Sequence, residues 1–405
     1  MRYFDYLTSE QEESLFYHPP ITFNHRTSKE LLAYAVGAAL YMPATRTSVP
    51  NDILKLRSAG LVTVIMDLED AIGDAEVEHA EESLLKHLIY LAAYAENERD
   101  GGDSLPLLFV RVRHPEQLRR LIFRLGSLVT MLTGFVFPKF SVENGMAYFE
   151  TIAEYNQTRS YSDPVLYGMP ILESAPIIYR ESRLESLLSI RDLLRNYREY
   201  VLNVRIGATD FSSLFGLRRS PDISIYDLTP IRDCISDIIN IFGRVEEGYV
   251  ISGPVWEYFA NKGHRVLRPQ LRQTPFEDTY GKSGREMRNH YITSSMDGLI
   301  REVVLDKENG ILGKTIIHPS HLRPVQAMYT VMHEEYVDAC SIVESNDGSL
   351  GVFKSQYSNK MNEIKPHLNW AKRVLLRSQI YGVLHEEQHF VGLLPENEFT
   401  HVQHS

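Results

Sequence analysis

Short apolar runs alternate along the chain with longer segments in which apolar residues recur every three or four positions. The short runs are rich in β-branched and aromatic residues and predict strands, whereas the longer segments 75–96, 115–128 and 182–200 predict amphipathic helices. Eight strands are predicted, at residues 39–42, 62–66, 107–112, 135–137, 165–172, 204–207, 249–251 and 315–317. This alternation is typical of parallel strands joined by helices.

The predicted strands are almost continuously hydrophobic, as expected when both faces of a parallel sheet are buried. Eight strand and helix units close most simply into a (β/α)8 TIM barrel, so we predict an α/β fold of this type. An open doubly wound sheet is the weaker alternative, because it would bring a glycine-rich turn after an early strand. The first predicted strand is followed instead by Pro43-Ala44-Thr45-Arg46.

Two segments do not fit a bare barrel. Residues 265–289, before the eighth strand, contain five arginines and few aliphatic residues and predict an inserted loop. This loop is either solvated or, as the less favoured alternative, binds a phosphate or nucleotide-like group of a substrate. The tail opens with a turn-like stretch at 346–349 and then predicts a helix at 368–384. We predict a barrel domain at 1–345, with its core at 31–330, and a C-terminal helical extension at 346–405 that forms a lid or an oligomer contact.

Composition and charge remove several classes of function. The net charge of −11 and the lack of a Lys/Arg block argue against nucleic-acid binding, which needs clustered cations. Cys234 and Cys340 are the only cysteines, so neither a disulfide framework nor a zinc site is expected and a reducing cytoplasm is the expected location. Residues 1–30 lack the pattern of a secretory signal, and no apolar run approaches the roughly 18 residues of a membrane-spanning helix.

Ionisable residues follow most of the predicted strands. In a barrel of parallel strands, the residues at the C-terminal strand ends meet at one mouth, where catalytic groups are found. The second to sixth and the eighth strands bring to these places Asp67, Glu69, Asp70, Arg111, Arg113, Lys139, Glu173, Asp210 and His318. We therefore predict an active site there.

Glu173 and Asp210 end successive predicted strands, so their carboxylates are expected to face the same mouth. Two hard oxygen ligands, completed by water and substrate oxygens, are typical of Mg²⁺ sites, and Mn²⁺ is an alternative occupant. Such an ion lowers the barrier to breaking a carbon–carbon bond beside a carbonyl, as in retro-aldol or retro-Claisen cleavage. Arg111 offers a planar donor for a carboxylate or an enolate oxygen.

Each assignment has a simpler alternative. Glu173 and Asp210 could form ion pairs with barrel arginines, and Lys139 and Lys314 could pair with neighbouring acids. The acids at 67–70 could also complement the dipole of a following helix. His318 is as consistent with a structural as with a catalytic histidine.

Seven segments resemble, in order, the motifs of the HpcH/HpaI aldolase and citrate lyase beta-subunit superfamily. The element at 64–71 is similar to "ILDLEDAV", and 171–175 is similar to "I-x-E-T/S-A". The others are 40–43 with Arg46, 109–112, 134–139, 206–211 with Gly216, and 313–319. The match runs from about residue 39 to residue 330 and implies a carbon–carbon lyase of the TIM-barrel fold.

The resemblance implies a role for each matched residue. Glu173 and Asp210 would hold Mg²⁺, Arg111 would contact the substrate carboxylate and oxyanion, and Glu69 with Asp70 would support metal-bound water. Substrate binding is assigned to Arg46, Arg111, Arg113 and Lys139. The superfamily acts on citryl-, malyl- and methylmalyl-type thioesters and related hydroxy-keto acids, so the expected partner is a small carboxylate, with coenzyme A left open. Its members form homotrimers or hexamers.

The chain also departs from the superfamily pattern. Arg113 replaces an Asn, which would favour a more anionic substrate, and the interval from Glu173 to Asp210 is long. The lid motif "M-I-D-x-P" is matched only loosely at 361–366, so whether Glu363 replaces its Asp is open. The extended chain resembles more closely a bacterial subgroup associated with stress and tellurite-resistance gene clusters. Two other functions stay open: a catalytically inactive barrel acting as a binding or assembly subunit, and a phosphoenolpyruvate-type enolate transferase.

Overall fold

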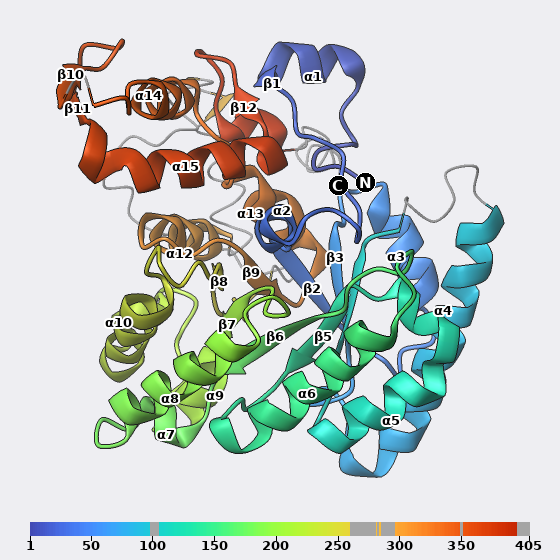
Figure 1. Cartoon of the computed structure of the whole chain (residues 1–405). Coiled ribbons are helices and arrows are strands. Elements are labelled where there is room, and N and C mark those ends of the chain that lie inside the picture. Colours follow the sequence, from blue (N-terminus) through green and yellow to red (C-terminus); the bar gives the residue numbers. More distant parts are fainter. Residues whose placement is uncertain (98–104, 260–280, 282, 285–295, 349–350, 395–405) are drawn as a thin grey trace. The chain divides into compact units, whose positions relative to one another are not determined.

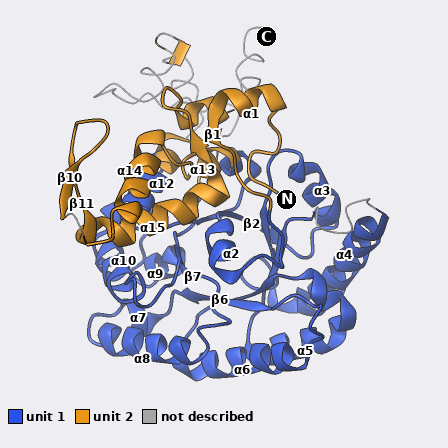
Figure 2. Ribbon diagram, turned by 45° about the horizontal axis from the view of Figure 1, so that its top comes forward, with its two compact units in different colours: residues 1, 23–257, 301–322 blue, residues 2–22, 258–300, 323–405 orange. Residues whose placement is uncertain are grey.

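The computed structural model describes the chain except for residues 98–104, 260–280, 282, 285–295, 349–350 and 395–405 (Figure 1). It forms two compact units that are interleaved in the sequence (Figure 2). Unit 1 comprises residues 1, 23–257 and 301–322, and unit 2 comprises residues 2–22, 258–300 and 323–405. The loop predicted at 265–289 lies outside the described residues, apart from Gly281, Ser283 and Gly284.

Unit 1 contains a barrel of eight parallel strands, which confirms the predicted fold. The strands are hydrogen-bonded in the order β8-β7-β6-β5-β4-β3-β2-β9. A parallel bridge between Gly253 and Lys314 joins the two end strands, and the Gly253 amide donates to the Gly313 carbonyl at 2.9 Å. The strands are β2 (Ala38–Pro43), β3 (Thr63–Asp67), β4 (Leu107–Arg111), β5 (Gly134–Phe137), β6 (Tyr167–Leu172), β7 (Val204–Ile206), β8 (Ile251–Ser252) and β9 (Lys314–Ile316).

Helices connect these strands around the outside of the barrel (Figure 1). The three predicted helices are confirmed as α4 (Val77–Asn97), α5 (Pro115–Leu125) and α8 (Arg183–Asn196). Helix α5 ends early because Gly126 adopts φ +55°, and a 3-10 turn, η2 (Gly126–Met131), follows. The remaining helices of unit 1 are α2 (Lys29–Ala35), α3 (Val49–Arg57), α6 (Val142–Thr158), α7 (Ala175–Ile178), α9 (Ala208–Ser213), α10 (Thr229–Phe242) and most of α12 (Asp297–Glu308), whereas α13 (Leu322–Ala327) belongs to unit 2 from residue 323 on.

The long interval between Glu173 and Asp210 is explained by two helices. Both α7 and α8 lie between β6 and β7, so the extra residues extend the connection and leave the two strands as neighbours. Short 3-10 turns elsewhere are η1 (Asp74–Glu76), η3 (Ile225–Asp227) and η4 (Pro319–His321).

A buried ion cluster supports the strand that closes the barrel. Lys314 Nζ lies 2.9 Å from Glu302 Oε1 and 2.7 Å from Asp306 Oδ2, which confirms that this lysine pairs with acids. Arg219 contacts Glu302 as well and lies 2.6 Å from Glu257. We call these five residues the closing cluster.

Unit 2 is built on two helices, α14 (His333–Glu344) and α15 (Ile364–Tyr381), the second of which confirms the helix predicted at 368–384. Their core comprises Val331, Ala339, Ile342, Ala371, Val374 and Val383. The unit also contains α1 (Ser9–Leu15), a pairing of β1 (Phe16–His18) with β12 (Val383–Leu384), a hairpin of β10 (Val352–Lys354) and β11 (Met361–Glu363), and η5 (Phe390–Leu393). None of the helices in the described parts of the chain is long and apolar enough to cross a bilayer.

Candidate active site

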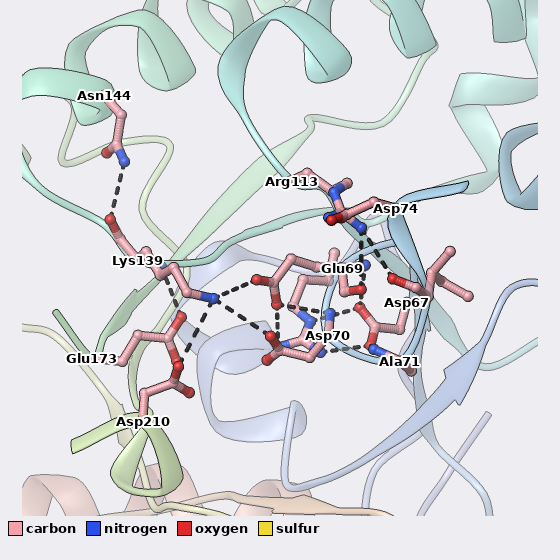
Figure 3. A network of polar contacts seen from close by, with 12 residues as sticks. Asp67, Glu69, Asp70, Ala71, Asp74, Arg113, Lys139, Asn144, Glu173 and Asp210 are labelled. Atoms are coloured by element: carbon pink, nitrogen blue, oxygen red, sulfur yellow. Dashed lines mark hydrogen bonds and ion pairs between the residues drawn. The ribbon is translucent and has the colours of Figure 1, made fainter. Parts of the chain in front are cut away.

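A cavity of about 450 Å³ opens at the C-terminal ends of the barrel strands. Five of the residues predicted from the strand ends line it: Asp67, Asp70, Arg111, Glu173 and Asp210. Glu69 and Lys139 join them in one network of polar contacts (Figure 3). We call these seven residues the site cluster.

Arg111, the last residue of β4, is held by acids of the neighbouring strand end. Asp67 lies beside it in register, and Arg111 donates through Nε and Nη2 to the two Asp67 oxygens at 2.7 and 2.5 Å. Its Nη1 lies 3.0 Å from Asp70 Oδ2 and 3.1 Å from Glu69 Oε2. Burial alone would lower the pKa of Arg111, but its hydrogen bonds and charge interaction with Asp67 raise it well above the usual value. The cavity wall therefore carries a permanent positive charge.

Asp67 also shapes the turn that follows β3. Its Oδ1 accepts from the Glu69 amide at 3.0 Å, and its Oδ2 accepts from the Ala71 amide at 3.2 Å. These bonds turn the chain so that Glu69 and Asp70 both face Arg111. Helix α4 begins only at Val77, so the acids at 67–70 do not cap it.

Lys139 connects the two halves of the site cluster (Figure 3). Its ammonium group contacts Glu69 and lies 3.4 Å from Asp70 Oδ1 and 3.8 Å from Asp210 Oδ1. Burial would lower its pKa, but the hydrogen bond with Glu69 and the charge of Asp70 raise it, so the side chain stays charged. The backbone at Lys139 has φ +45°, a conformation that non-glycine residues seldom adopt. Its amide thereby donates to Glu173 Oε1 at 2.7 Å.

A glycine leaves room for the Glu173 carboxylate beside Asp210. Glu173 follows β6 and is 4% exposed, and Asp210 lies in the first turn of α9, after β7. A Cβ atom at Gly207 would lie 2.0 Å from Glu173 Oε2, so only glycine leaves room for the carboxylate. The two strands are adjacent, as the sequence predicted.

The pKa values of both carboxyl groups are raised above their usual values. Burial and then the charge of Asp210 raise the pKa of Glu173 to about 8. Burial and then the charge of Asp70 raise the pKa of Asp210. An added cation would relieve this repulsion, and two carboxylates with water and substrate oxygens suit Mg²⁺. Within the described residues no group of three or more His, Cys, Asp and Glu is arranged to hold a metal, so an ion here would have only this pair as protein ligands.

The pKa values of Glu69 and Asp70 are shifted in opposite directions. Burial raises the pKa of Glu69 despite the opposing charge of Arg111. The pKa of Asp70 is lowered because Arg111 and other partners outweigh the effect of burial. Glu69 is therefore the more basic carboxylate of the two.

Three residues predicted from the strand ends and motifs neither line this cavity nor belong to the site cluster. Arg46 is 58% exposed and pairs with Asp52 at 2.8 Å. Arg113 contacts Asp74 and donates to the Ile72 carbonyl at 3.2 Å. His318 caps η4, where Nδ1 accepts from the Ser320 amide at 3.2 Å.

The lining residues that sequence reasoning missed include Tyr41, Arg205 and Thr315. The Arg111 guanidinium lies over the Tyr41 ring at 5.1 Å from its centroid. Arg205 Nη2 donates to Thr315 Oγ1 at 2.7 Å. For Arg205 the sequence did contain a signal, because it is a single arginine inside the otherwise apolar predicted strand at 204–207.

Known structures resemble the chain at low sequence identity. A citrate lyase from Burkholderia xenovorans LB400 is 16% identical with a TM-score of 0.56, covering 89% of this chain and 96% of its own. CitE from Mycobacterium tuberculosis, in complex with magnesium, acetoacetate and coenzyme A, is 18% identical with a TM-score of 0.49, covering 85% of this chain and 99% of its own. At such identity the likeness to the Burkholderia protein supports the fold alone.

A search of curated proteins finds no match. The family model described as C–C bond lyase of the TIM-barrel fold matches residues 30–383, which include the whole site cluster and every strand of the barrel. This match confirms the resemblance drawn from the motifs and the prediction of a lyase. The chain therefore belongs to the family of C–C bond lyases of the TIM-barrel fold.

Proposed function

We propose that the protein is a Mg²⁺-dependent lyase that cleaves a carbon–carbon bond of a small carboxylate substrate by retro-aldol or retro-Claisen chemistry. The observation that carries the proposal is the pair Glu173, which is buried, and Asp210, which is half-buried: they follow adjacent strands and share one cavity with Arg111. The raised pKa values of both acids support it, because a divalent cation is what such a pair lacks.

Glu173 and Asp210 would hold the ion, with Mn²⁺ as an alternative occupant. When bound, Mg²⁺ would polarise a substrate carbonyl and offset the negative charge that develops as the bond breaks. The amide of Lys139 fixes the orientation of the Glu173 carboxylate at 2.7 Å. The chain thus positions both acids before a substrate arrives.

Arg111 would bind the substrate carboxylate or the oxygen on which charge develops. Its pairing with Asp67 fixes the plane of the guanidinium, so that little reorganisation is needed during the reaction. Glu69 is the better candidate than Asp70 to accept a proton from bound water, because its pKa is raised toward neutrality. Lys139 would offset the negative charge of the acids around it and reduce the repulsion between them.

The decisive experiment is a Mg²⁺ titration of Glu173→Gln by calorimetry, without any substrate. We expect the affinity to fall at least about tenfold, because one of two protein ligands loses its charge. Glu143→Gln is the matched control, since Glu143 is an exposed carboxylate at the start of α6. Equal Mg²⁺ affinity of the wild type and Glu173→Gln would rule out the proposed metal site.

A coenzyme A thioester, a homotrimer or hexamer, and a lid role for Glu363 stay predictions from the resemblance. A phosphorylated group on the substrate stays a prediction from the arginines at 265–289. Glu363 is an exposed residue of unit 2 at the end of β11. We also leave Arg46 and Arg113 outside the proposed site, because their side chains pair with other acids.

A further inference from the structure

Arg205 is a buried arginine that has no carboxylate partner among the described residues. It lies in the middle of β7, its side chain lines the cavity, and the residue is 1% exposed. Nη2 donates to Thr315 Oγ1, but Nε and Nη1 have no hydrogen-bond partner among the described residues. Arginine is seldom fully buried unless it is paired, because an unpaired charge loses its hydration. Something other than the described residues is expected to complete this site.

The strand register places Arg205 below the carboxylate pair. Ile171 of β6 lies beside Arg205, so Glu173 lies beside Gly207. Positions two residues apart on a strand share a face and are separated by about 6.6 Å along it. Arg205 therefore lies one layer deeper in the barrel than Glu173, and the same cavity reaches both side chains.

Arg205 and Arg111 differ in the hydrogen-bond partners of their guanidinium groups. Asp67 takes Nε and Nη2 of Arg111, and two further acids contact its Nη1. In the part of the chain that the structure describes, the Arg205 guanidinium contacts the Thr315 hydroxyl group and lies 5.9 Å from the centroid of the Tyr41 ring. Of the two cations, Arg205 is the one with more donors left for an anion.

We propose that Arg205 binds a second carboxylate of the substrate, at the end away from the metal pair, so that the substrate class is a small dicarboxylate. The inference rests on the proposed function, which assigns the upper part of the cavity to the ion and the reacting carbonyl. Thr315 assists by orienting the guanidinium. The cavity of about 450 Å³ suits a small acid that reaches from one layer to the next.

The test uses pairs of 2-oxo acids that differ only in their far end, in the presence of Mg²⁺. Oxaloacetate is compared with 2-oxobutyrate, and 2-oxoglutarate with 2-oxopentanoate, by calorimetric titration of the full chain. We expect the wild type to prefer one diacid at least about tenfold over its monoacid, as a buried charge pair contributes. In Arg205→Met this preference should fall below about twofold, while the affinity for the monoacid is unchanged.

Protein stability provides a second readout. Arg219 is a buried arginine whose partners Glu257 and Glu302 belong to the chain, so it is the matched control. We expect Arg219→Met to lower the melting temperature of the ligand-free protein and Arg205→Met to leave it unchanged or raise it. A melting temperature that falls equally in both variants would indicate a structural role for Arg205 and overturn the inference.

The other outcomes are equally decisive. A wild type without preference for either diacid, including one that binds neither acid of a pair, overturns the inference. So does a preference that survives in Arg205→Met. Binding of phosphoenolpyruvate in place of the diacids, lost in Arg205→Met, would also overturn it, because the group bound by Arg205 would then be a phosphate. Failure of the metal site is recognised separately, since Mg²⁺ binding by Glu173→Gln is measured without any acid.

Discussion

The closing cluster and the site cluster are two groups of charged side chains in the same barrel unit, and they differ in the ratio of cations to carboxylates. The closing cluster contains two cations, Arg219 and Lys314, and three carboxylates, and the side chains of Lys314, Glu302 and Asp306 are fully buried. The site cluster contains two cations, Arg111 and Lys139, but five carboxylates. Surplus negative charge is thus concentrated beside the cavity.

The partners in the two clusters explain this difference. In the closing cluster the remaining oxygens have donors from the chain, since Tyr226 donates to Asp306 at 2.5 Å and the Ile225 amide donates to Glu302 at 2.9 Å. In the site cluster, burial and the charge of Asp210 raise the pKa of Glu173, and burial and the charge of Asp70 raise the pKa of Asp210. A charge cluster that is complete within the chain stabilises the fold, whereas one that lacks a cation is suited to bind one.

The largest expected effect comes from breaking the complete cluster. Lys314→Met leaves Glu302 and Asp306 buried without their common cation, so we expect a loss of about 3–5 kcal/mol in the free energy of unfolding. Denaturant unfolding monitored by circular dichroism measures it. Lys55→Met, at an exposed position on α3, is the control and should change stability by less than about 0.5 kcal/mol. A loss below about 1 kcal/mol in Lys314→Met would mean that the cluster is not a stabilising unit.

The second prediction concerns how the incomplete cluster responds to pH. The pKa of Glu173 is raised from 4.5 to about 8 in the folded protein. This carboxyl therefore favours the metal-free folded state below pH 4.5, and that contribution is lost as the pH rises through about 8. Mg²⁺ must displace the proton, so its affinity should rise about tenfold per pH unit up to about 8 and then level off.

Calorimetric Mg²⁺ titrations at several pH values measure this slope. In Glu173→Gln the part of the slope due to this carboxyl should disappear, because glutamine does not titrate. An affinity in the wild type that is the same at about pH 6 and pH 8 would contradict the charge imbalance assigned to the site cluster.

The comparison also indicates what the sequence could and could not predict. The eight strands were predictable because apolar runs buried on both faces leave a continuous signal, and the strand-end rule then brought Glu173, Asp210 and Arg111 together. The strand-end rule could not predict Arg205, because this residue lies in the middle of a strand and not at its end. The partners of Arg46 and Arg113 depend on how the turns after β2 and β3 fold, which periodicity does not encode.

The smallest effect is expected at Arg46, and it tests where the site cluster ends. Arg46 is exposed and pairs with Asp52 at 2.8 Å, so Arg46→Ala should cost less than about 1 kcal/mol of stability. Since its side chain does not line the cavity, the affinity for 2-oxobutyrate in the presence of Mg²⁺ should change by less than about twofold. Arg111→Ala, measured by the same calorimetric titration, should lose at least about tenfold. A comparable loss in Arg46→Ala would instead support its predicted role as an anion contact. Arg46 would then have to be counted as part of the site cluster.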